Sequence, residues 1–234
     1  MQPGQPGAIL YPATVTEHQV TQQPNCEQRV TEIHRLLNRA EISGPYVVVG
    51  FSLGGVVARL YSHDYPEEVA GMVIIDHAFI DVGSDSTPVE SPTPDSKGNS
   101  PPVLISKTPI TLGIEDDLNF GRLPPRGQEL HRWAMSNHPA RPTAETAAEC
   151  VAAVERATNG QTFPLGDKPL IVIQTRNDAL NYAKLQSKLM ALSRDSQLAT
   201  AEDSTHMVII DRPDVIVSAI RRVVDAVRTG TRLQ

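Results

Sequence analysis

The chain has 234 residues, of which 40% are hydrophobic and 21% are charged, and its formal net charge is −6. The apolar content is too high for a disordered chain, and the length suffices for one large domain or two small ones. An acidic balance argues against nucleic-acid binding, and no apolar run approaches the roughly 18 residues of a membrane-spanning helix. Because the N-terminus also lacks the pattern of a secretory signal, we expect an acidic globular protein of the cytoplasm.

The two cysteines are too few for a disulfide framework or a zinc cluster. Cys26 and Cys150 are therefore interpreted as two unrelated thiols. The histidines of the chain show no spacing typical of metal ligands, so no metal site is expected.

The first half of the chain alternates between helical and strand patterns. Asn25 is predicted to cap a helix, with Gln28 three residues later as in a capping box. The run 46–49 is typical of a strand buried on both faces, and 53–65 carries a helical apolar stripe. A second buried strand is predicted at 72–75. Strand, helix and strand in this order predict a parallel sheet with right-handed crossovers.

The middle of the chain departs from this alternation. Residues 81–102 are rich in Ser, Pro, Asp and Gly, which predicts a loop. Helical patterns follow at about 127–137 and 144–157 without a strand between them. Such a segment is typical of a cap inserted over a sheet.

The alternation resumes at Lys168 with a buried strand at 170–173, a helix, a short strand at 198–200 and a last helix opened by Pro213. These elements predict an α/β fold, a mostly parallel sheet flanked by helices. The predicted division is a core of residues 1–78 and 167–234 with an inserted loop and helical cap of residues 79–166.

The sequence Gly50-Phe51-Ser52-Leu53-Gly54-Gly55 lies between a predicted strand and a predicted helix. Gly-x-Ser-x-Gly in that context is a nucleophile elbow, a sharp turn that lifts the serine hydroxyl above the sheet. Glycines two positions on either side of Ser52 are expected to avoid a clash. The backbone amide of Leu53, at the helix N-terminus, would stabilise a developing oxyanion.

A serine hydroxyl needs a base, and the base needs an orienting acid. His206 lies in a loop after the last predicted strand and is the candidate base. Two carboxylates follow neighbouring strands, Asp178 after 170–173 and Asp76 after 72–75. Both would lie at the carboxyl edge of the sheet. Asp178 is the favoured acid and Asp76 the alternative.

From Cys26 to its C-terminus the sequence resembles the α/β-hydrolase superfamily, in its serine esterase and lipase branch. Three stretches carry the resemblance: 44–55, 69–76, and Ser204-Thr205-His206 with Asp211-Arg212-Pro213. The resemblance implies that Ser52 is the nucleophile, His206 the base and Asp178 the acid. It also implies that 79–166 form a cap shaping the pocket, and that neither a cofactor nor a metal is required.

The N-terminal part departs from the family pattern. Only 44 residues precede Pro45, and they contain no His-Gly pair to supply the second oxyanion amide. The first strands of the fold are therefore expected to be missing. A shortened product, a misassigned start and a replacement built by residues 1–24 are all consistent with this pattern. The open sheet edge would favour a homo-oligomer.

The function predicted from these residues is hydrolysis of a small-molecule carboxylic ester through a Ser-His-Asp triad and an acyl-enzyme. Two alternatives stay open. The chain could be a hydrolase-like binding protein with little or no catalysis, or an acyltransferase or thioesterase that uses the same triad.

Overall fold

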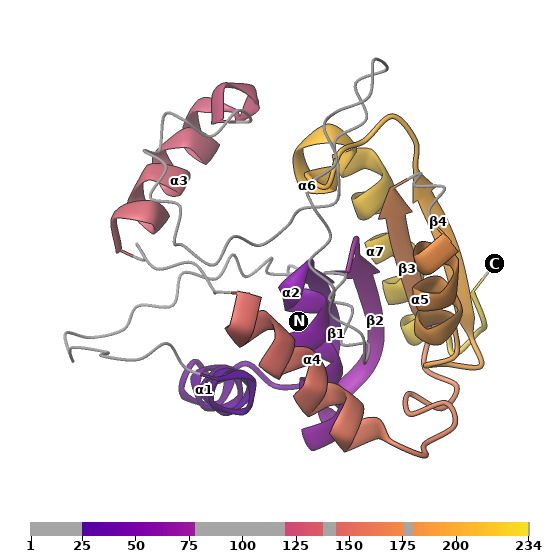
Figure 1. The fold of residues 1–234 in the computed structure, drawn as a ribbon. Coiled ribbons are helices and arrows are strands. Elements are labelled where there is room, and N and C mark those ends of the chain that lie inside the picture. The colour runs from indigo at the N-terminus through magenta and orange to yellow at the C-terminus, as the bar shows by residue number, and fades with distance from the viewer. Residues whose placement is uncertain (1–24, 78–119, 138–143, 176–179, 234) are drawn as a thin grey trace, which may run out of the picture. The chain divides into compact units, whose positions relative to one another are not determined.

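The computed structural model describes residues 25–77, 120–137, 144–175 and 180–233 of the chain (Figure 1). The described residues belong to two compact units, considered one at a time. The smaller contains residues 120–137, and the larger contains all the others. The predicted loop at 81–102 and the carboxylate of Asp178 lie outside the described residues.

The larger unit is built on a parallel four-stranded sheet, in the order β1-β2-β3-β4. The strands are β1 (Tyr46–Phe51), β2 (Val69–Ile75), β3 (Leu170–Thr175) and β4 (Ser196–Ala201). Each strand pairs with its neighbour in the chain, which requires a crossover on the face of the sheet after every strand. The predicted α/β fold with a parallel sheet is confirmed.

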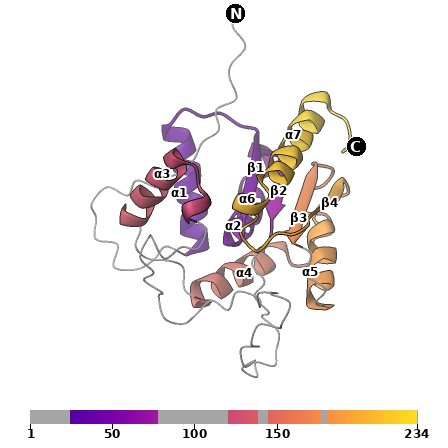
Figure 2. The same ribbon diagram turned by 90° about the horizontal axis from the view of Figure 1, so that it is seen from above.

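Helices cover both faces of this sheet. The helices of the larger unit are α1 (Cys26–Arg39), α2 (Leu53–Asp64), α4 (Ala144–Thr158), α5 (Leu180–Met190), α6 (Val208–Asp211) and α7 (Pro213–Thr229), with a 3₁₀ turn η1 (Pro66–Glu68) before β2. Helix α7 lies against one face, and α2 and α5 lie against the other (Figure 2). None of the described helices combines the length and apolar character that a membrane crossing requires.

The alternation of side chains along β2 explains why both faces are covered. Val73 and Ile75 pack with α7, whereas Met72 and Ile74 pack with α2 and the end of α5. All four side chains are at most 2% exposed. A strand with apolar residues on both faces is stable only between two layers of helices, which is the arrangement observed.

A disulfide joins the first helix to the middle of the chain. Helix α1 has the predicted capping box. The Asn25 side chain accepts a hydrogen bond from the Gln28 backbone amide at 2.8 Å, and the Gln28 side chain accepts one from the Asn25 backbone amide at 2.9 Å. Cys26, the first residue of α1, bonds to Cys150 of α4 with 5.2 Å between Cα atoms. The interpretation as unrelated thiols was wrong. Both α1 and α4 pack on α2, which brings together cysteines that are 124 residues apart.

Helix α4 shares a hydrophobic core with α1 and α2. Cys150, Val151 and Val154 of α4 are buried in this core. The predicted assignment of 79–166 to a cap stays a prediction, and both α4 and Leu165 pack in the same unit as the sheet.

The smaller unit contributes a 3₁₀ turn η3 (Phe120–Arg122) and helix α3 (Pro125–Asn137). The Arg132 guanidinium lies over the Phe120 ring at 4.7 Å, and Arg126 pairs with Glu129 at 2.6 Å between nitrogen and oxygen.

Strand β1 was predicted to be buried on both faces, and here the prediction was wrong. Val49 is 41% exposed, and only Gly50 of the six residues is buried. Among the described strands β1 pairs with β2 alone, so it forms one edge of the sheet. Self-association through this edge stays a prediction.

Candidate functional site

Ser52 lies on a sharp turn between β1 and α2. Its backbone has φ 52° and ψ −123°, a left-handed conformation that is uncommon for a residue with a side chain. The Ser52 amide donates to the Ile75 carbonyl at 2.9 Å, which fixes the turn to the neighbouring strand. The predicted strand–turn–helix context of the nucleophile elbow is present.

Of the two glycines expected to allow this turn, Gly50 is required and Gly54 is not. A Cβ at Gly50 would lie 2.4 Å from the Gly54 carbonyl oxygen, so no side chain fits there. A Cβ at Gly54 itself would meet no described atom within 4 Å. At Gly55 it would meet Ile74 and His77 at 3.2 and 3.3 Å. The turn therefore requires Gly50, while the close approach of α2 to β2 involves Gly55 rather than Gly54.

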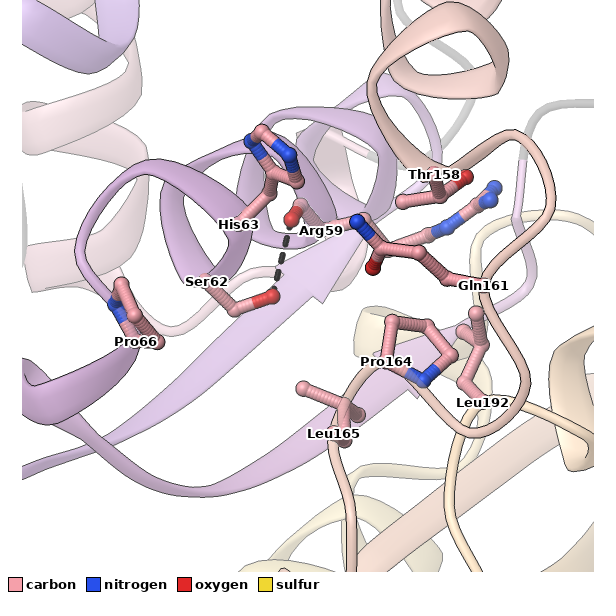
Figure 3. Close-up of a pocket in the computed structure, with 9 residues that line it drawn as sticks. All are labelled: Arg59, Ser62, His63, Pro66, Thr158, Gln161, Pro164, Leu165 and Leu192. Carbon is pink, nitrogen blue, oxygen red and sulfur yellow. Dashed lines mark hydrogen bonds between the residues drawn. The ribbon is translucent and has the colours of Figure 1, made fainter.

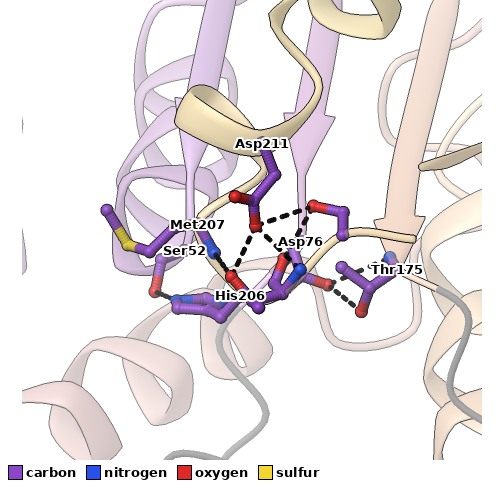
Figure 4. Close-up of polar contacts among 8 residues, drawn as sticks. Ser52, Asp76, Thr175, His206, Met207 and Asp211 are labelled. Carbon is purple, nitrogen blue, oxygen red and sulfur yellow. Dashed lines mark hydrogen bonds and ion pairs between the residues drawn. The ribbon is translucent and has the colours of Figure 1, made fainter. Parts of the chain in front are cut away.

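A chain of hydrogen bonds connects Ser52 to a buried carboxylate. The Ser52 Oγ lies 3.1 Å from the His206 Nε2, and the His206 Nδ1 lies 2.6 Å from the Asp76 Oδ2 (Figure 4). With Nδ1 donating to the carboxylate, Nε2 is the acceptor for the serine hydroxyl. The arrangement can move the Ser52 proton to His206 and stabilise the imidazolium that forms.

Asp76 is held at the carboxyl end of β2. Its backbone φ is 37°, its side chain is 2% exposed, and its amide donates to the Ile173 carbonyl at 2.7 Å. The Oδ1 that does not face His206 lies 3.4 Å from both the amide and the hydroxyl of Thr175, at the end of β3. Thr175 was not predicted as a site residue. Its position at the end of the strand next to β2 is the signal that could have found it.

The loop carrying His206 is organised by Asp211. The Asp211 carboxylate accepts from the Thr205 amide at 2.9 Å and from the Thr205 hydroxyl at 2.6 Å (Figure 4). The Met207 amide in turn donates to the Thr205 hydroxyl at 3.1 Å. Two backbone amides on either side of His206 are thus bonded within the loop, which limits the positions that the imidazole can take.

The imidazole is also positioned by an aromatic neighbour. The Phe51 and His206 rings lie 4.9 Å apart between centroids. The His206 side chain is nevertheless 31% exposed.

Leu53 is the first residue of α2, directly after Ser52. Amides of the first helical turn lack carbonyl partners in the helix and carry partial positive charge. The Leu53 amide is therefore suitably located for a negative oxygen formed at Ser52.

The structure thus brings together Ser52, His206 and the alternative acid Asp76. The favoured acid, Asp178, lies outside the described residues, so its place relative to His206 stays a prediction. Within the described segments, no group of three or more His, Cys, Asp or Glu side chains could hold a metal ion.

Comparison with known families agrees with this geometry. The model of the Alpha/beta hydrolase family matches residues 3–219. The chain belongs to this family. The resemblance carried by the turn around Ser52 is confirmed, and the sheet and its helices correspond to part of the α/β-hydrolase fold.

A curated relative of this chain is the uncharacterized protein YqjL of Bacillus subtilis (strain 168), which is 24% identical over 201 residues. That match covers 83% of this chain and 62% of the relative. The chain therefore spans less than two thirds of the length of that relative.

Solved structures of other proteins share the fold at low sequence identity. A putative lipase from Acinetobacter baumannii AYE is 17% identical with a TM-score of 0.54. The match covers 91% of this chain and 71% of the lipase chain. A thermophilic esterase from Thermogutta terrifontis is 19% identical with a TM-score of 0.53, and the covered shares are 87% and 73%. A putative non-heme bromoperoxidase from Mycobacterium tuberculosis H37Rv is 16% identical with a TM-score of 0.51, with shares of 91% and 78%. These structures support the fold and leave the substrate open.

Proposed function

We propose that this α/β-hydrolase cleaves a carboxylic ester through Ser52, His206 and Asp76. The observation that carries the proposal is the continuous hydrogen-bond chain from the Ser52 Oγ through His206 to the Asp76 carboxylate. Esterase and lipase structures among those that share the fold are consistent with this reaction class.

The proposed reaction begins with attack of the Ser52 Oγ on the ester carbonyl. His206 accepts the hydroxyl proton at Nε2, and Asp76 holds the Nδ1–H and stabilises the imidazolium. The Leu53 amide donates to the oxyanion of the tetrahedral intermediate. The intermediate collapses when His206 protonates the leaving alcohol, and an acyl-Ser52 ester remains. A water activated by His206 then releases the carboxylic acid and restores the hydroxyl.

Two observations favour Asp76 as the acid. The His206–Asp76 distance of 2.6 Å is that of a strong charge-assisted hydrogen bond, and Thr175 occupies the other carboxylate oxygen. One carboxylate oxygen of Asp76 thus contacts the His206 imidazole, and the other contacts Thr175 at the end of β3. The alternative acid, Asp178, is tested by the variants described in the Discussion.

The experiment is intact-mass analysis after exposure to a fluorophosphonate, which reacts with activated serines. We expect one adduct on the wild-type chain and none on Ser52→Ala. Ser218→Ala is the matched control, because Ser218 is exposed on α7 and outside the hydrogen-bond chain. An adduct that persists in folded Ser52→Ala, or no adduct on folded wild type, would contradict the proposal.

A further inference from the structure

A cavity lies near the end of helix α2 that is farther from Ser52. It is a cavity of about 220 Å³ between the C-terminal half of α2, the segment after α4 and the end of α5 (Figure 3). Its lining residues are Arg59, Ser62, His63, Pro66, Thr158, Gln161, Pro164, Leu165 and Leu192. Ser62 is ten residues from Ser52 along the helix, a separation of about 15 Å at 1.5 Å per residue. The cavity is therefore distinct from the site around Ser52.

Arg59 is a positively charged lining residue of this cavity, and one of its side-chain donors lacks a hydrogen-bond acceptor in the described part of the chain. Among the described residues, the buried Arg59 Nε has no hydrogen-bond partner. The Arg59 Nη1 lies 3.5 Å from the His77 Nε2, at the limit of a hydrogen bond. Burial lowers the pKa of Arg59 to about 10, although the nearby Glu155 carboxylate opposes this shift. A half-buried guanidinium whose Nε lacks an acceptor within the described segments favours an anion close to it.

The rest of the lining divides into a polar and an apolar side. Arg59, Thr158 and Gln161 lie together on one side, and Pro164, Leu165 and Leu192 lie on the other (Figure 3). No Asp or Glu is among the lining residues, and the Glu155 carboxylate lies outside the lining. A ligand that fits both sides has a negative head and a short apolar body.

The volume limits the size of that ligand. Pockets for drug-sized molecules begin at about 300 Å³, and this cavity is smaller. A short-chain carboxylate suits the available space, and its planar group matches the fork of donors that a guanidinium presents.

We propose that this cavity binds a small carboxylate, with its negative group at Arg59 and its short chain against Leu165 and Leu192. The site does not depend on the reaction proposed for Ser52, since none of its residues takes part in the chain from Ser52 to Asp76.

The test is a titration of the ¹⁵N-labelled protein with sodium butyrate at constant ionic strength, made up with sodium chloride. The readout is the Nε–Hε cross-peak of Arg59 in the NMR spectrum, assigned by its loss in Arg59→Lys. This signal reports on the cavity itself, so butyrate bound near Ser52 does not imitate it, and failure of the proposed reaction leaves it unchanged. Sodium phosphate is titrated in parallel as a small anion without an apolar body.

We expect a saturable shift of the Arg59 signal with butyrate and a weaker response to phosphate. Gln161→Trp places a large side chain at an exposed lining position and should weaken butyrate binding by about tenfold or more, because the ligand loses access to a charged donor. Arg156→Trp is the matched control, since it places the same large side chain at an exposed position on α4 outside the lining and should bind as wild type does. The proposal is overturned if the shift fails to saturate, if Gln161→Trp binds as wild type does, or if phosphate binds more tightly than butyrate.

Discussion

Reduction of the Cys26–Cys150 disulfide should destabilise the larger unit strongly. The bond closes a loop with a sequence separation of 124 residues. The loss of loop-closure entropy in the unfolded chain corresponds to about 5 kcal/mol for a loop of this length. With an unfolding entropy of about 2.1 cal/mol/K per residue, this free energy lowers the Tm by roughly 10 °C.

The assay is thermal unfolding followed by circular dichroism, with and without a phosphine reductant. The fraction reduced is measured by alkylation in denaturant and mass spectrometry. The Cys26→Ala, Cys150→Ala double variant is the control, and its Tm should not respond to the reductant. A wild-type protein that is shown to be fully reduced and melts within about 2 °C of the oxidised form would refute the reasoning.

Three further predictions concern the acid that orients His206, the turn at Ser52 and Tyr61 of α2. Asp76→Asn should slow fluorophosphonate labelling of Ser52 by about 10⁴-fold, because the imidazole loses the partner that fixes its tautomer. Asp178→Asn should leave the labelling rate nearly unchanged. The opposite ranking of the two variants would assign the acid to Asp178. Gly50→Ala should cost about 3 kcal/mol or more in unfolding free energy, measured in urea, because its Cβ would lie 2.4 Å from a carbonyl oxygen, whereas Gly54→Ala should be well tolerated. Burial and a hydrogen bond to a carboxylate raise the pKa of Tyr61 above its ordinary value of 10.0, so the folded chain retains a proton that the unfolded chain releases. Stability should therefore fall as the pH rises above 10.0, and equal slopes in wild type and Tyr61→Phe would contradict this.

The strands and the nucleophile turn were predictable because their signals are local. The apolar runs at 72–75 and 170–173 lie within observed strands, and the capping box at Asn25 is observed. The turn at Ser52 combines a strand pattern, two glycines and a helical stripe within a few residues, so it needs no knowledge of distant contacts.

The remaining features depend on packing between distant segments. Carboxylates follow both β2 and β3, and the sequence does not show which of them reaches His206. The role of Thr175 depends on the pairing of β3 with β2, and the disulfide depends on two helices meeting on α2. Val49 was predicted to be buried because it belongs to a β-branched run, yet its exposure is decided by the position of β1 at the sheet edge.

The disulfide also bears on where the protein is expected to reside. Disulfides persist in oxidising compartments and are rare in the cytosol. The cytoplasmic location expected from the sequence stays a prediction, and the bond between Cys26 and Cys150 counts against it.

The strand order has a consequence for the newly made chain. Because each strand pairs with its chain neighbour, the sheet can grow in the direction of synthesis. Asp76 and His206 are 130 residues apart, so at about 5–20 residues per second the ribosome adds the histidine roughly 6 to 26 s after the aspartate. A nascent chain would thus carry its serine but remain without this base until the segment after β4 has been made. Until then, the reaction proposed for Ser52 should not be possible.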